Sequence, residues 1–208
     1  MQANVWAAFF AVPFIANTDS DLYLAGQLQT VGNDAAPDYF NHGGASSGTV
    51  SAASRARSSV EPSIAALESA LAAANAVAAS VPPARAHFYA AHTLLQIKIA
   101  LLSAQSIVAL AEGVVNISTG NIAGATAAVS QSQDLVDAIF AEQRAAERGT
   151  QWHGIYMYDK LSNYGRARQS VHQLLVGLQV RATVWMTPCR CVLFSYRSAV
   201  RVGLNAHA

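Results

Sequence analysis

The residues best suited to chemistry lie together in one short stretch of the chain, residues 147–169. Aromatic side chains with a polar tip are typical of half-buried, half-wet places such as binding rims and interdomain seams. We take six residues of this stretch, the aromatic corner, as candidate contacts with a ligand or partner. They are Trp152, His153, Tyr156, Tyr158, Asp159 and Arg166.

Within the aromatic corner, His153 and Asp159 form the one pair that suggests a reaction. A histidine beside a carboxylate can transfer protons, so a glycosidase-related hydrolase that uses this pair is one alternative. No residue pattern marks a nucleophile, and we assign no catalytic residue. We therefore lean towards a protein that is not an enzyme.

The competing interpretation of the same stretch is structural. Trp152 and Tyr156 would close the end of a helical bundle, and Asp159 would cap its last helix. The two arginines that follow would pair with acids of the preceding helix. In that interpretation, Arg166 and Arg168 bind Glu142 or Glu147.

The remaining candidate ligands do not form a metal or cofactor site. His87 and His92 are five residues apart, so they do not share a helix face. His42 lies in a glycine-rich stretch and is expected to be solvated. Cys189 and Cys191 have no second half to complete a zinc site. The chain carries no phosphate loop or dinucleotide motif, and it lacks the Glu-x-x-His of di-iron bundles. We predict no cofactor and no metal.

The elements that position these residues are expected to be helices. Of the 208 residues, 52% are apolar and 12% are charged, which excludes disorder. Alanine contributes much of the apolar share and favours close helix–helix approach. Five helices are expected over residues 3–12, 49–60, 83–114, 121–148 and 159–181. Two more are expected between them: one is capped by Thr18 or Asp19 and ends near Gly32, and the other begins at Ile64 and ends before Pro82.

Short connections between these helices predict an all-α, up-and-down antiparallel bundle with two or three long helices. The helix over 83–114 has two apolar faces and is expected at the centre. Residues 32–48 are rich in turn formers and are expected to be a loop. Residues 1–181 would form the bundle domain.

No membrane span is expected. The most apolar segment, residues 99–111, has 13 residues without charge, fewer than the roughly 20 that cross a bilayer. The first residues carry an apolar run without a basic start, so a signal peptide is not expected either. The sequence does not indicate in which cellular compartment the protein resides.

The charge is unevenly distributed along the chain. Residues 1–159 hold six Lys and Arg with all twelve acids, whereas residues 160–208 hold seven Lys and Arg and no acid. The basic quarter either packs on the acidic body or binds an anion or membrane surface. Its last part, residues 182–208, lacks a helical stripe and is expected to be a poorly fitting or disordered tail.

Two stretches resemble a known family. Residues 120–130 and 141–156 resemble helical hairpins that follow the catalytic barrels of large glycoside hydrolases, where an acidic helix ends in glycine and a Trp-x-Gly-x-Tyr-like turn. Residues 8–17 and 22–25 are similar to the aromatic helix and loop of the helical domain in α-glucuronidase-type enzymes. The resemblance implies an accessory piece or fragment of a glycosidase-like protein, because the chain holds no barrel and no pair of catalytic carboxylates.

The sequence therefore predicts a non-catalytic helical accessory or interaction domain. Its aromatic corner would contact a neighbouring domain, another protein or a carbohydrate; nucleic acid is not an expected partner. The two alternatives are the hydrolase that uses His153 and Asp159, and the anion- or membrane-surface-binding protein with a basic end.

Overall fold

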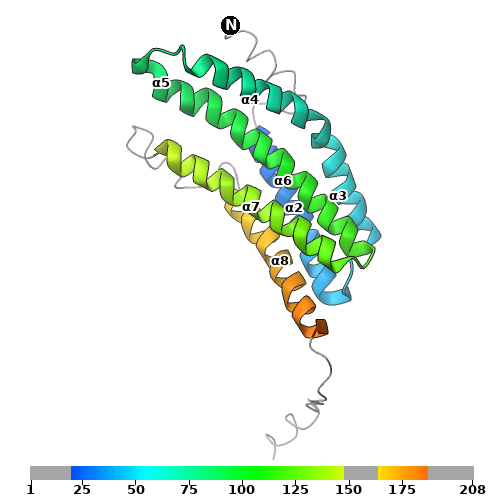
Figure 1. Ribbon diagram of the computed structural model, residues 1–208. Coiled ribbons are helices and arrows are strands. Elements are labelled where there is room, and N and C mark those ends of the chain that lie inside the picture. Colours follow the sequence, from blue (N-terminus) through cyan, green and yellow to red (C-terminus); the bar gives the residue numbers. More distant parts are fainter. Residues whose placement is uncertain (1–19, 148–163, 187–208) are drawn as a thin grey trace, which may run out of the picture.

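The computed structural model describes residues 20–147 and 164–186, and the side chains of residues 24–147 and 164–181. Every regular element within these residues is helical, which confirms the all-α bundle (Figure 1). The elements are α2 (Ser20–His42), α3 (Ser47–Val60), a 3₁₀ turn (Glu61–Ser63), α4 (Ile64–Ala78), α5 (Pro83–Tyr89), a π-helical turn (Ala90–Leu94), α6 (Leu95–Ser118), α7 (Ile122–Glu147) and α8 (Tyr164–Met186).

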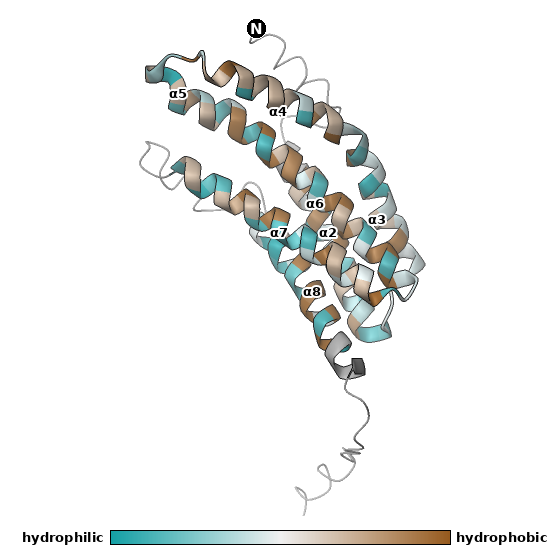
Figure 2. Cartoon of the chain, in the orientation of Figure 1, coloured by the Kyte–Doolittle hydropathy of each residue, from teal (hydrophilic) through white to brown (hydrophobic). Residues whose placement is uncertain are grey.

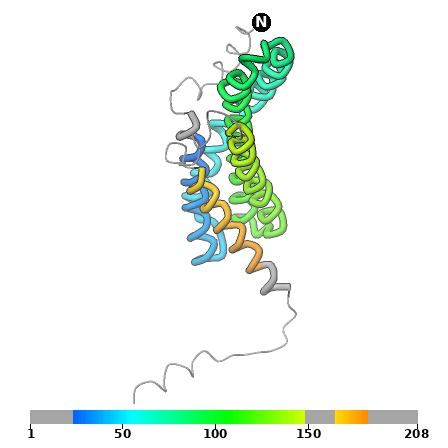
Figure 3. Tube along the Cα trace, turned by 90° about the vertical axis from the view of Figure 1, so that its left-hand side faces the viewer, coloured from blue at the N-terminus to red at the C-terminus, as the bar shows by residue number. Residues whose placement is uncertain are grey.

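The described elements form five helical runs, because α3 continues into α4 and α5 into α6. Successive runs alternate in direction, as expected for an up-and-down bundle. The first and last of them, α2 and α8, therefore lie parallel. Helices α2, α6, α7 and α8 contact one another in a ring, and α3 and α4 pack on the outer side of α6. In Figure 3, α2 and the start of α8 lie in one layer and α6 and α7 in the next.

The run from α5 to α6 is the centre of the bundle, as predicted. Apolar positions recur along α6 (Figure 2), and most of its residues are buried. The run Pro83–Ser118 is long and apolar enough to cross a bilayer, but 67% of its most apolar window is buried inside the protein. Core helices of soluble bundles have the same composition.

Small residues let the helices approach closely. A Cβ atom added to Gly32 of α2 would lie 2.8 Å from the Ser170 Cβ on α8, and one added to Gly113 of α6 would lie 2.6 Å from the Val129 Cγ2 on α7. Both distances are shorter than an ordinary carbon–carbon contact. Glycine is therefore favoured at these two crossings by space and not by backbone conformation.

The prediction that residues 32–48 form a loop is wrong, and so is the helix end near Gly32. Helix α2 continues through Pro37 to His42. It continues because Val31, Ala35 and Tyr39 are buried on its inner face, so tertiary packing outweighs the local turn signals. The chain turns at Gly43, whose φ of 71° suits glycine.

Other helix ends also differ from the prediction. Helix α6 does not end at 114 but extends to Ser118, so the connection to the next helix is shortened to the residues around Gly120 (φ 75°). Helix α8 does not end at 181 but continues to Met186, into the first residues of the expected tail. The expected helix over 3–12, the caps Thr18 and Asp19, the residues 159–163 and the rest of the tail lie outside the described residues.

Candidate functional site

Most of the aromatic corner lies outside the described residues. This applies to Trp152, His153, Tyr156, Tyr158 and Asp159, so their roles stay predictions. The sixth residue, Arg166, lies on the first turn of α8 and is exposed.

For Arg168, the partner in the structure is not the predicted Glu142 or Glu147. Glu142 binds Lys98 of α6, whose Nζ donates to both carboxylate oxygens at 3.0 and 2.9 Å. Arg168 instead forms an ion pair with Asp137 of α7. This pair joins α8 to α7, so the described part of the basic quarter packs on the bundle.

Two pairs of buried hydroxyl groups in the described core bind each other across helices. Tyr164, fully buried at the start of α8, shares a 2.6 Å hydrogen bond with Ser103 of α6. The hydroxyl oxygens of Ser106 and Ser132 lie 2.8 Å apart, and each lies 3.0 Å from the other residue's carbonyl oxygen, so the two hydroxyl protons are distributed over these three contacts. These hydroxyls hold α6, α7 and α8 in register.

The first candidate site is an apolar groove of about 590 Å³ between the parallel helices α2 and α8. Pro37 and Phe40 line it from α2, and Val176 lines it from α8. Phe40 is 59% exposed, and Val180, one turn beyond Val176, is 55% exposed. In the described part of the chain, its lining includes one histidine, His172, and no Lys, Arg, Asp or Glu. We call these residues the α2–α8 surface.

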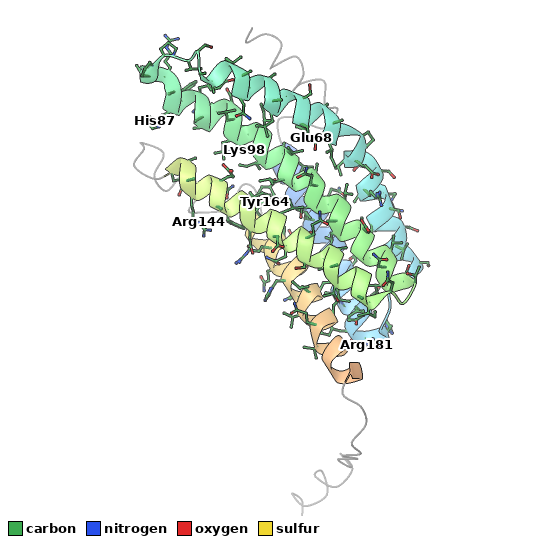
Figure 4. All side chains as sticks on the ribbon, in the orientation of Figure 1. Glu68, His87, Lys98, Arg144, Tyr164 and Arg181 are labelled. Carbon is green, nitrogen blue, oxygen red and sulfur yellow. The ribbon has the colours of Figure 1, made fainter. Side chains whose placement is uncertain are left out.

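The fold holds Phe40 in place on this surface. Its ring lies against Gly177 of α8, where an added Cβ would come within 2.7 Å of the ring. The neighbouring Tyr39 points inward, and the guanidinium of Arg181 lies over its ring at 5.3 Å (Arg181 is labelled in Figure 4). Burial raises the pKa of Tyr39, against the opposing effect of Arg181. Phe40 is therefore presented from a fixed helix and not from a loop.

The end of α2 is also tied to the start of α3. The Asp38 carboxylate accepts hydrogen bonds from the Ser46 backbone N–H at 2.9 Å and from the Thr49 hydroxyl. These hydrogen bonds, that from Thr49 above all, lower the pKa of Asp38 below its usual value of 3.8. They fix the turn that follows Phe40.

The second candidate site is a cavity of about 260 Å³ between the π-helical turn and the last turns of α7. Ala90, Ala91 and Leu94 of the turn line one wall, Ala145 and Ala146 of α7 line the other, and the Lys98–Glu142 pair and His87 complete it. Figure 4 shows His87 near the tip of α5 and Lys98 further along the same run. We call this the π-turn pocket.

The three histidines named in the sequence analysis lie in different surroundings. His87 lines the π-turn pocket, whereas the His92 ring stacks near Phe88 at a centroid distance of 4.3 Å. His42 is the exposed last residue of α2 and not part of a glycine-rich loop. Among the described residues, no three His, Cys, Asp or Glu side chains gather where they could hold a metal ion.

Sequence reasoning missed both sites for identifiable reasons. Phe40 and Pro37 fell in the expected loop, so they were not considered as part of a helical surface. The π-helical turn has no glycine or proline to mark it. Comparison with protein-family models, curated proteins and solved structures finds no match for this chain.

Proposed function

We propose that this chain is a non-catalytic helical accessory domain that docks a partner protein domain through the α2–α8 surface. The observation that carries the proposal is Phe40, a large apolar ring held 59% exposed above a groove of the same character. Covering such a ring stabilises a complex by about 1–2 kcal/mol. Scattered exposed apolar residues are ordinary, but Phe40, Val176 and Val180 lie together.

The composition of the surface favours a protein as the partner. Centres of protein–protein interfaces are rich in aromatic residues and poor in charge; this surface presents the ring of Phe40, and its lining includes no Lys, Arg, Asp or Glu among the described residues. Nucleic acids and anionic membranes bind through clustered cations. Two cations of α8 are already engaged within the bundle, because Arg168 binds Asp137 and Arg181 lies over Tyr39.

The family resemblance supports a neighbouring protein domain as the partner. A helical accessory piece of a glycosidase-like protein would pack against a neighbouring domain, on the same or another chain. The aromatic corner remains a second proposed contact, with a partner domain or a carbohydrate. The hydrolase that uses His153 and Asp159 stays an alternative that no described residue favours.

The proposal is tested by photo-cross-linking in cells that express the full chain. A benzophenone amino acid replaces Gln173, an exposed residue that lines the groove, and in a matched control it replaces Phe88, which is 60% exposed on α5. We expect one dominant cross-linked protein from position 173, weakened by Phe40→Ala and absent from position 88. Equal products at both positions, or no product, would overturn the proposal. A cross-link to a second copy of the chain would show a homodimer contact and overturn it as well.

A further inference from the structure

We propose that the π-turn pocket binds a small neutral molecule that carries two adjacent hydroxyl groups on a compact carbon ring. The pocket shares no lining residue with the α2–α8 surface. Ligand binding in the π-turn pocket is therefore independent of partner binding at the α2–α8 surface, and a failure of one proposal leaves the other standing.

The size and walls of the pocket set the first limit on the ligand. Its volume of about 260 Å³ equals that of roughly nine water molecules at liquid density. A single six-membered ring with its substituents fits such a space. Methyl groups of Ala90, Ala91 and Ala145 and the side chain of Leu94 face this space and suit the C–H surface of a ring.

The ion pair at the pocket sets the second limit. The Lys98 ammonium has three N–H groups, two of which bond the two Glu142 oxygens. The third remains for a ligand oxygen, and each carboxylate oxygen keeps a further lone pair. One ligand hydroxyl can thus accept from Lys98 while its neighbour donates to Glu142. Because Lys98 and Glu142 neutralise each other, a charged ligand would meet one like charge, and a neutral one is favoured.

The π-helical turn is an independent reason to regard this place as a site. Single π-helical turns within α-helices occur frequently at functional sites. This one lies in the wall of the pocket, where it supplies Ala90, Ala91 and Leu94. Just before it, the Tyr89 hydroxyl donates a 2.9 Å hydrogen bond to the Ala74 carbonyl oxygen on α4, which fixes the α5 side of the turn.

The test is a titration of the full chain, labelled at alanine and leucine methyl groups, followed by NMR. The probes are vicinal cyclohexanediol and myo-inositol, with cyclohexanol and cyclohexanecarboxylate for comparison. We expect saturable shifts of the Ala90, Leu94 and Ala145 methyl signals with dissociation constants in the millimolar range, since a ligand of about ten non-hydrogen atoms makes few contacts. We expect cyclohexanol and the carboxylate to bind about tenfold more weakly than the diol.

Variants locate the binding. Ala145→Phe fills the pocket from an exposed position and should abolish the ligand-induced shifts of the Ala90 and Leu94 methyl signals. In the control Ala127→Phe, at an exposed position elsewhere on α7, these shifts should be unchanged. Glu142→Gln keeps the shape of the side chain. It should weaken binding of the diol several-fold and leave binding of cyclohexanol unchanged. Absence of saturable shifts with any diol would overturn the proposal. Equal binding of diol and cyclohexanol, tighter binding of the carboxylate, or unchanged binding in Ala145→Phe would also overturn it.

Discussion

The crossing of α6 and α7 at Gly113 predicts a specific effect of adding one methyl group. In Gly113→Ala, the new Cβ would lie 2.6 Å from the Val129 Cγ2, about 1 Å closer than a normal carbon–carbon contact. Val129 is fully buried, and a β-branched side chain in a helix has one strongly preferred rotamer. Either the two helices separate or Val129 leaves that rotamer.

The magnitude follows from two opposing terms. Overpacking of this kind costs about 1–3 kcal/mol, and alanine in place of glycine stabilises a helix by about 1 kcal/mol. We therefore expect Gly113→Ala to lower the free energy of unfolding by about 0–2 kcal/mol. Val129→Ala alone should lower it by about 2–3 kcal/mol, but it removes the clashing methyl group. In that background, Gly113→Ala should raise the free energy of unfolding by about 1 kcal/mol.

The assay is urea unfolding of the full chain followed by circular dichroism, for the two single variants and the double variant. The coupling energy between positions 113 and 129 should be about 1–3 kcal/mol. Gly26→Ala is the matched control, because nothing lies within 4 Å of an added Cβ there. It should stabilise the protein by about 0.5–1 kcal/mol. If Gly113→Ala stabilises the otherwise unchanged protein as Gly26→Ala does, the close approach of α6 and α7 is refuted.

Three further predictions concern helix ends and the core. Asp38→Asn should lower the free energy of unfolding near neutral pH by about 1 kcal/mol. Because folding lowers the pKa of Asp38, the difference in unfolding free energy between the parent chain and Asp38→Asn should be full above the usual pKa of 3.8. It should vanish as the pH falls through the pKa of the folded state, which urea unfolding at several pH values would show. A difference that does not depend on pH would contradict the prediction. Gly43→Ala should cost about 1–3 kcal/mol in the same assay, since φ at Gly43 is 71°, a backbone conformation that alanine rarely adopts, and an unchanged stability would contradict that conformation. Tyr164→Phe should lower the melting temperature by removing the hydrogen bond to Ser103, worth about 1 kcal/mol; Ser103→Ala should then cost less when combined with Tyr164→Phe than in the parent chain.

Residue patterns within a single helix predicted much of the fold. The helices over 49–60, 83–114 and 121–148 were predicted to within a few residues, because their apolar spacing and flanking prolines or glycines are local signals. The up-and-down order followed from short connections. These predictions needed no knowledge of which helix contacts which.

Features that depend on contacts between distant residues were not predicted. Gly32 and Pro37 indicate a turn locally, yet α2 continues because it packs along α8, more than a hundred residues later. Likewise, Arg168 binds Asp137 and not Glu142, because the rotation of α8 against α7 decides which acid it faces. The π-helical turn has an ordinary helical composition, so no pattern distinguished it.

Binding of a protein partner to the α2–α8 surface is tested most directly by measuring the affinity. The partner identified by cross-linking is purified and titrated calorimetrically with the unmodified chain, Phe40→Ala and Phe88→Ala. We expect Phe40→Ala to weaken binding about tenfold or more, as for a central aromatic contact, and Phe88→Ala to leave it unchanged. Equal affinities for all three forms would contradict the claim.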